Sequence, residues 1–260
     1  MLFSDRPRTH YTNSQLREVI CQIRFPAILS IGAKEPADFQ EAVRHVFPRY
    51  AVKQDQPPVK VTVTNGVPHV EKPAPVTNYH FVSADNKWKL NLTRDFISLS
   101  TLNYDSWEDF GKMLDRPLAE FIRIYQPAFF QRIGLRYSNL FSRQKLDLEG
   151  EPWNELIEPP YLGILSQEDV VEQRCNQCNT QFDVALDNSC RVKVLAGPAK
   201  IKPAPNMPAD NELKFVLDMD LYMGGEISPM LAAGALETLH GHSTTIFEGA
   251  ITDKMRSALR

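Results

Sequence analysis

The chain has 260 residues, 43% of them hydrophobic and 23% charged, and its 29 basic and 32 acidic side chains give a net charge of −3. This composition excludes an intrinsically disordered chain, and the lack of internal repeats excludes a collagen-like or solenoid protein. Nineteen prolines outnumber twelve glycines, and the sequence contains no glycine-rich phosphate loop and none of the common hydrolase, zinc-protease or calcium motifs.

The first predicted elements are a strand, a short helix and a proline-rich excursion. Apolar residues alternate over residues 16–25, which predicts a half-buried strand. Helical spacing over residues 36–48, with proline at both ends, predicts a short amphipathic helix. Five prolines within residues 57–75 flank the turn signal Asn65-Gly66, so we expect an edge strand or hairpin with an irregular excursion there.

A meander and a long helix follow. Short apolar runs predict three antiparallel strands, at residues 79–82, 88–92 and 97–102. Asp105 or Ser106 then caps a helix whose apolar face continues to Tyr125. Pro117 predicts a kink or break in this helix, with Asp115 able to cap its second part.

The second half of the chain follows the same order. Alternation predicts a strand at residues 132–141, and a short helical piece is expected near residues 153–165. Three further strands are expected, near residues 170–186, 191–195 and 213–222. Ser228 caps a long helix with Pro229 at its first position, and Thr252 caps a final helical turn.

Strands that cluster between helices predict an α+β fold with one sheet layer and one helix layer. We expect a single domain, residues 1–260, built of two β-α-β(3–4)-α halves at about 15–127 and 128–260. The halves would form one long curved antiparallel sheet with helices packed on one face, as in TATA-binding-protein-like or helix-grip folds. The proline-rich loops 57–75 and 198–208 are candidate loops for partner recognition.

A family resemblance extends in order along nearly the whole chain. The stretches that carry it are Glu18–Phe25, Trp88–Thr93, Ser98–Ser100, Tyr104–Trp107, Arg132–Asn139, Leu217–Asp220, Leu239–His240 and Ile246–Glu248. In these stretches the chain resembles a sporadically distributed bacterial protein family of unknown function. The resemblance implies no specific activity, but sporadic distribution is typical of genes on mobile or defence-associated islands.

Two acidic residues form the first candidate site. Asp218 and Asp220 lie two apart in a predicted strand, so both carboxylates project from the same face. Paired carboxylates at this spacing hold divalent metal ions in several nucleotidyl-transferring enzymes. The upstream Gly-Ser helix start of such enzymes is missing, which favours a structural role as a solvent-facing strand side or as partners of Arg132 and Arg136.

A helical cluster is the second candidate site. Glu237 and His240 share a helix face, as ligands in di-metal helix bundles do, and His242 follows, but a second such motif is missing. A histidine that bonds to a neighbouring strand is the favoured interpretation. If the helix crosses the last strand, His240 could meet Asp218 or Asp220, and the three together would form a site.

Three of the four cysteines suggest zinc by their spacing. A structural zinc site needs four ligands, and only three are present here, Cys175, Cys178 and Cys190. On a strand, the thiols of Cys175 and Cys178 would also point to opposite faces. The same geometry argues against a redox pair at a helix start. We therefore expect no cofactor, and the four cysteines, Cys21 included, suit a reducing compartment.

Arginines on two predicted strands form the last candidate site. The residues are Arg24, Arg132, Arg136 and Arg143, with Tyr79, Trp88 and Tyr137 as nearby aromatic platforms. A basic stripe of this kind suits nucleic acid or a phosphorylated ligand. Salt bridges to Glu18, Asp218 and Asp220 are the favoured alternative because the total charge is close to neutral.

We therefore expect a non-enzymatic binding or interaction protein that forms a homodimer or contacts a protein partner through its sheet face. The alternatives are metal-dependent phosphoryl or nucleotidyl transfer by Asp218, Asp220 and His240, and nucleic-acid binding by an arginine-rich sheet face. The net charge does not indicate nucleic acid. The sequence has no signal-peptide core and no apolar run of about 18 residues, so a cytoplasmic location without membrane contact is expected.

Overall fold

The computed structural model describes residues 2–64, 67–175, 177–201 and 210–260. The predicted turn at Asn65-Gly66 and most of the second proline-rich loop, including Pro203, Pro205 and Pro208, lie outside the described residues. Within the described ranges, none of the helices has the length and apolar character needed to span a membrane.

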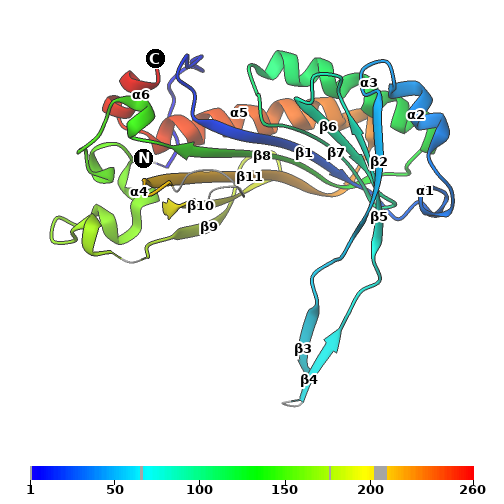
Figure 1. Cartoon of the computed structure of the whole chain (residues 1–260), viewed down its shortest axis with the longest axis horizontal. Helices are drawn as coiled ribbons and strands as arrows, with labels where there is room; N and C mark the ends of the chain where they lie inside the picture. The colour runs from blue at the N-terminus through cyan, green and yellow to red at the C-terminus, as the bar shows by residue number, and fades with distance from the viewer. Residues whose placement is uncertain (1, 65–66, 176, 202–209) are drawn as a thin grey trace. The chain divides into compact units, whose positions relative to one another are not determined.

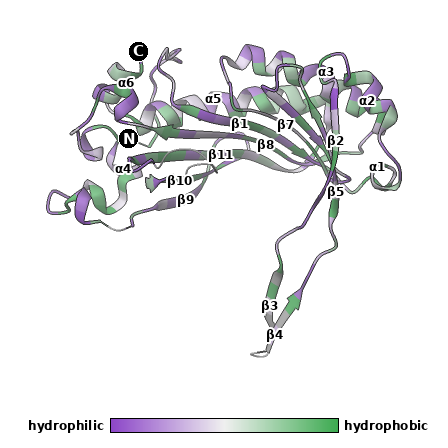
Figure 2. Cartoon of the chain, in the orientation of Figure 1, coloured by the Kyte–Doolittle hydropathy of each residue, from purple (hydrophilic) through white to green (hydrophobic). Residues whose placement is uncertain are grey.

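The protein has an α+β fold in which helices accompany a large antiparallel sheet, which confirms the predicted fold class (Figure 1). In sheet order the nine strands are β2 (Arg49–Asp55), β5 (Val76–Val82), β6 (Trp88–Leu92), β7 (Phe96–Thr101), β1 (Leu16–Arg24), β8 (Phe130–Phe141), β11 (Leu213–Ile227), β10 (Cys190–Lys200) and β9 (Thr180–Ala185). Hydrophobic and hydrophilic residues alternate along many of these strands, as one-sided burial requires (Figure 2).

The chain divides into two compact units. Unit 1 comprises Met1–Cys21, Ile133–Gly224 and Met230–Arg260, and unit 2 comprises Gln22–Arg132 and Gly225–Pro229. Outward from β1 the strands run β7, β6, β5, and outward from β8 they run β11, β10, β9. On both sides, the strand that comes first in the chain, β1 or β8, is followed in the sheet by later strands in reverse chain order. That the chain is a single domain, and that it is built of two repeated halves, are still predictions.

The described residues of unit 2 form three helices, α1 (Leu29–Ala33), α2 (Ala37–Val43) and α3 (Trp107–Tyr125). The Ser106 side chain caps α3 by accepting a hydrogen bond from the Asp109 backbone N–H. Aromatic contacts join the helices to the strands: ring centroids lie 4.6 Å apart in the pair Phe25–Phe121 and 5.5 Å apart in the pair Phe39–Phe81. Phe25, which directly follows β1, therefore packs against α3, and the buried face of β5 packs against α2.

Helix α3 continues through Pro117, so the predicted break is wrong. Proline lacks an N–H group and removes one hydrogen bond from a helix interior. Leu114, Leu118 and Phe121 are buried on both sides of Pro117, and this packing outweighs the local cost. Asp115 consequently lies inside one helix and caps no second one.

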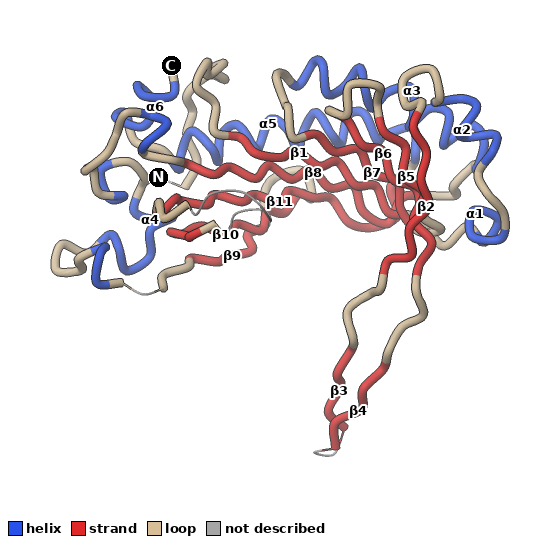
Figure 3. The backbone as a smooth tube through the Cα atoms, in the orientation of Figure 1, coloured by secondary structure: helices blue, strands red, loops and turns tan. Residues whose placement is uncertain are grey.

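Two strands of unit 2 form a separate hairpin, β3 (Lys60–Thr64) and β4 (Val67–Glu71), which pair antiparallel as the sequence suggested. This hairpin extends away from the sheet strands of its own unit (Figure 3). Val61 and Val70, directly paired, are each 61% exposed. Strand β2 was not predicted because all seven of its residues are exposed, so no apolar alternation marks it.

Unit 1 contains the helices α4 (Pro159–Leu162), α5 (Ala232–Ala250) and α6 (Asp253–Leu259), and short 3₁₀ turns flank α4. Thr252 caps α6 as predicted, by accepting a hydrogen bond from the Met255 backbone N–H. Two predictions need correction. The strand expected from residue 170 begins only at Thr180, after a 3₁₀ turn at Glu172–Arg174, and α5 begins after a 3₁₀ turn at Pro229–Leu231 instead of directly at a Ser228 cap.

Candidate functional site

The outward face of β8, β11, β10 and β9 in unit 1 contains the predicted acidic pair and one predicted arginine. Alternation on β11 buries Leu217 and Met219 and leaves Asp218 on the opposite face. The Arg136 guanidinium donates two hydrogen bonds to the Asp218 carboxylate, one of 2.7 Å from Nε to Oδ1 and one from Nη2 to Oδ2. The hydrogen bond to Asp218 raises the pKa of Arg136, and the charges of Asp218, Asp220 and Glu18 add to it.

Strands β10 and β9 continue this pattern of opposite charges. Lys193 lies directly opposite Asp220 on β11 and opposite Asp183 on β9. Arg191 Nη2 lies 2.9 Å from Asp183 Oδ1, and Lys193 Nζ lies 3.9 Å from Asp183 Oδ2. Cations and anions therefore alternate across the strands, and neighbouring side chains hold each other in place.

A shallow hollow of about 180 Å³ lies within this surface. Leu195 provides an apolar centre, since it is 41% exposed and lies between Asp218 on one strand and Gln181 on the other. We name this surface the open face and define it by Arg136, Gln181, Lys193, Leu195, Asp218 and Asp220.

The structure does not bring His240 to the acidic pair, so the predicted three-residue constellation is wrong. His240 Nδ1 lies 2.8 Å from the Tyr137 hydroxyl, and Tyr137 is buried on the helix side of β8. Arg136 and its partner Asp218 lie on the other side of the sheet, because adjacent residues of a strand point to opposite faces. The structural alternative is confirmed for Asp218, which pairs with Arg136, and for His240, which bonds to a strand residue.

No group of three or more histidine, cysteine, aspartate or glutamate side chains could hold a metal ion in the described part of the chain. Cys175 and Cys178 precede β9 instead of lying on it, and the Cys178 thiol donates a 3.3 Å hydrogen bond to the Leu162 carbonyl. All four cysteines are free thiols, and burial, followed by the charge of Asp187, raises the pKa of Cys190.

Two of the predicted aromatic platforms, Trp88 and Tyr137, do not join the arginines. Trp88 packs on Phe110 of α3 with ring centroids 5.7 Å apart, and Tyr137 contacts α5, so both rings lie on helix-facing sides of their strands. Arg24 lies 3.7 Å from the Asp95 carboxylate. Arg132 is half-buried on β8 and belongs to unit 2.

Arg143 contributes to a partly buried cluster and not to a basic stripe. Its guanidinium lies 4.5 Å from the centre of the Trp153 ring and donates a 2.9 Å hydrogen bond to Glu172. Glu172 also accepts the Trp153 backbone N–H. These contacts hold the segment that precedes β9 against Trp153 and Arg143.

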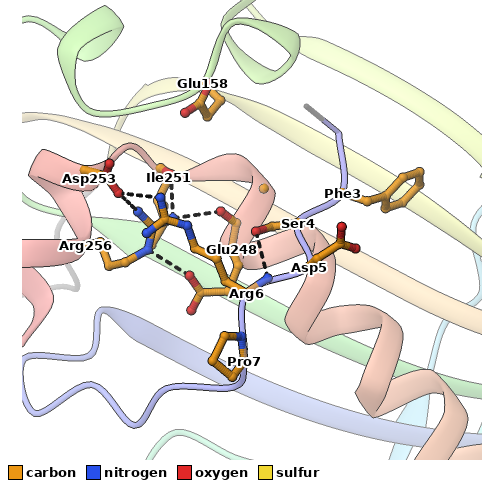
Figure 4. A pocket seen from close by; sticks show the side chains of 11 residues that line it. Phe3, Ser4, Asp5, Arg6, Pro7, Glu158, Glu248, Ile251, Asp253 and Arg256 are labelled. Carbon is orange, nitrogen blue, oxygen red and sulfur yellow. Dashed lines mark hydrogen bonds and ion pairs between the residues drawn. The ribbon is translucent and has the colours of Figure 1, made fainter.

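A second cluster, which the sequence analysis missed, joins the N-terminal segment to α5 and α6 of unit 1 (Figure 4). Glu248 and Arg256 form an ion pair with side chains only 2% and 7% exposed. The Tyr11 hydroxyl donates a 2.6 Å hydrogen bond to Glu248, and Arg256 also donates to the backbone carbonyls of Glu248 and Ile251. Burial, reinforced by the hydrogen bond to Glu248, raises the pKa of Tyr11 well above its ordinary value.

A hollow of about 540 Å³ lies beside this cluster, and both guanidiniums that line it are paired. Arg6 lies 2.9 Å from Asp253, which also pairs with Arg256. The main chain of the segment approaches α5 so closely that a Cβ on Gly249 would lie 2.6 Å from the Leu2 carbonyl oxygen. Because the charged groups of this cluster pair with one another, we infer that the cluster has a structural role and holds the N-terminal segment against α5 and α6.

Comparison with models of known protein families finds no match for this chain. A search of curated proteins finds no significant match.

Proposed function

We propose that the chain is a non-catalytic binding protein and that its open face contacts another protein surface. The observation that carries this proposal is the fixed, alternating charge of that face. Arg136 is held by Asp218, and Lys193 lies between Asp183 and Asp220. A surface whose charged side chains are already ordered loses less conformational entropy when a partner binds.

The balance of charge favours a second copy of the same chain as the partner. In a two-fold symmetric interface one patch must complement itself, so it needs both signs of charge. Arg136, Lys193, Asp218 and Asp220 supply two of each sign around the exposed Leu195. Nucleic acid is less well matched, because the carboxylates between the cations would repel phosphates.

The metal-dependent alternative receives no support from the geometry. It requires Asp218, Asp220 and His240 at one ion, whereas Asp218 is paired with Arg136 and His240 bonds to Tyr137 on the other side of the sheet. We also propose that the chain belongs to the sporadically distributed bacterial family that it resembles and that it is located in the cytoplasm.

Sedimentation velocity of paired variants tests the proposal. Leu195→Glu places an acid directly opposite Asp218, at the centre of the open face, and we expect it to convert the dimer to monomer. Leu102→Glu is the matched control, since Leu102 is 71% exposed and belongs to unit 2, and we expect it to leave the dimer intact. A wild-type chain that sediments as a monomer at micromolar concentration, or equal effects of both variants, would refute the proposed interface.

A further inference from the structure

Strand β2 forms one end of the large sheet, and its outer edge has no neighbouring strand in the part of the chain that the structure describes. All seven of its residues are exposed. Val52, at the centre of the strand, is 43% exposed although it lies on the same side as Tyr50, whose ring centroid is 5.4 Å from that of Phe81. The edge is therefore accessible to another strand, and proteins usually cover or interrupt such an edge.

The strand register determines which backbone groups point out of the sheet. The Ser83 N–H donates a 3.0 Å hydrogen bond to the Trp88 carbonyl, so the backbone groups of Ser83 point toward β6. This direction alternates along an antiparallel strand, so Val82 points toward β2, where it lies opposite Arg49. Three residues of β2 consequently direct their backbone N–H and C=O groups away from β5: Tyr50, Val52 and Gln54.

These outward groups are complementary to those of a second, antiparallel β2. In a two-fold arrangement centred on Val52, each Val52 lies opposite the other, and Tyr50 of either copy lies opposite Gln54 of the other. Every outward N–H and C=O group of these residues then gains a partner. Pro48 and Pro57 lie just outside the strand and limit the ladder. Only the arrangement centred on Val52 pairs the whole strand.

The charges of β2 favour the same arrangement. It places Arg49 of each copy directly opposite Asp55 of the other, on one side of the joined strands. Opposite charges directly across two strands stabilise a pair. Both side chains keep atoms for this contact, since Arg49 donates to Asn86 through one guanidinium nitrogen and one Asp55 oxygen accepts the 2.6 Å hydrogen bond from Asn78.

The remaining side chains fit the arrangement but keep it weak. Lys53 lies opposite Ala51 of the other copy, whose small side chain leaves the lysine room to extend into water. The two Val52 side chains contact each other and bury apolar surface that is exposed in a single copy. The two Lys53 ammonium groups share one side of the joined strands, and their repulsion limits the affinity.

We propose that β2 pairs edge to edge with β2 of a second copy, so that the sheets of two chains become continuous. Seven residues on each side are fewer than the roughly 20–30 of a standard interface, so we expect a Kd of about 100 µM. Strand β2 belongs to unit 2 and the open face to unit 1, so this inference goes beyond the proposed function and the two can fail separately. A chain with two self-pairing surfaces joins open-face dimers into larger assemblies at high concentration.

Charge-swapped variants test the pairing in a chain whose open face carries Leu195→Glu. Sedimentation equilibrium of this parent at about 10–500 µM is expected to show reversible dimerisation. Arg49→Asp places acids opposite each other and Asp55→Arg places arginines opposite each other, so either change should weaken self-association at least about tenfold. An equimolar mixture of the two variants again has opposite charges at both ends and should recover the parent's affinity.

Three outcomes of this experiment would overturn the inference. One is a parent that stays monomeric over the whole range, which would leave the edge to an unrelated extended peptide. Another is an affinity that neither Arg49→Asp nor Asp55→Arg weakens. The third is a mixture that associates no better than its components, because a merely structural effect of the two changes would not be repaired by mixing.

A proline variant of the same parent separates pairing from folding. An edge strand tolerates proline where its N–H faces solvent, so Val52→Pro should keep the circular dichroism spectrum of the parent. It removes the central donor from both copies and is expected to weaken self-association at least about tenfold. Val52→Thr keeps the N–H and the branched shape, and as the matched control it should retain the affinity. A folded Val52→Pro variant that dimerises like the parent would contradict the inference, and if this variant does not fold, the mixture of charge-swapped variants decides.

Discussion

The buried ion pair of Glu248 and Arg256 gives the sharpest stability prediction. Arg256→Met keeps most of the side-chain volume but leaves the Glu248 carboxylate, 2% exposed, without its cation. It also removes the donor to the carbonyls of Glu248 and Ile251. Breaking a buried pair by removing one partner costs about 3–5 kcal/mol, because the remaining charge stays uncompensated.

Urea denaturation followed by circular dichroism and by tryptophan fluorescence measures this loss, and coincidence of the two signals checks for two-state behaviour. We expect Arg256→Met to lower the free energy of unfolding by about 3–5 kcal/mol. Adding Glu248→Gln should restore part of the loss, because the double variant no longer buries a charge.

Arg123→Met is the matched control for this experiment. Arg123 forms an ion pair with Glu120 on α3, but its side chain is 68% exposed. Exposed pairs contribute about 0.2–1 kcal/mol, so the control should differ little from the parent. A loss below about 1 kcal/mol for Arg256→Met, or equal losses in the two variants, would refute the argument that burial determines the cost.

Three further predictions concern the same end of unit 1. Because burial and the Glu248 carboxylate raise the pKa of Tyr11 above 10.0, stability should fall as pH rises above that value, and urea titrations at alkaline pH should show a smaller fall for Tyr11→Phe. Gly249→Ala should displace the segment that contacts α5, since its Cβ would lie 2.6 Å from the Leu2 carbonyl, and limited proteolysis should then cleave before β1 faster than in the parent. Thr252→Ala removes the α6 cap and should cost about 1 kcal/mol in urea denaturation; no change would show that the cap is not needed.

Periodic burial explains which elements could be predicted from the sequence. The strand β1 and the helix α3 have one buried and one exposed side, and their boundaries were predicted within a few residues. Strand β2 is exposed along its whole length and depends on pairing with β5, which local sequence does not encode. Pro117 was given too much weight because tertiary packing of its neighbours cannot be inferred from local propensity.

The candidate sites show the same limit. The pairing of Arg136 with Asp218 could be anticipated from charge and alternation on two strands. The contact of Tyr11 with Glu248 joins residues 237 positions apart and has no local signal.

Cross-linking between copies tests the central claim, contact through the open face, most directly. Equal amounts of ¹⁵N-labelled and unlabelled protein are mixed and treated with a zero-length carbodiimide, which joins lysine amines to carboxylates. Cross-linked peptides that contain one labelled and one unlabelled partner can form only between copies. We predict such mixed peptides between Lys193 and the acids Asp218 and Asp220. Mixed peptides found only outside the open face, or none at concentrations at which a dimer sediments, would contradict the account.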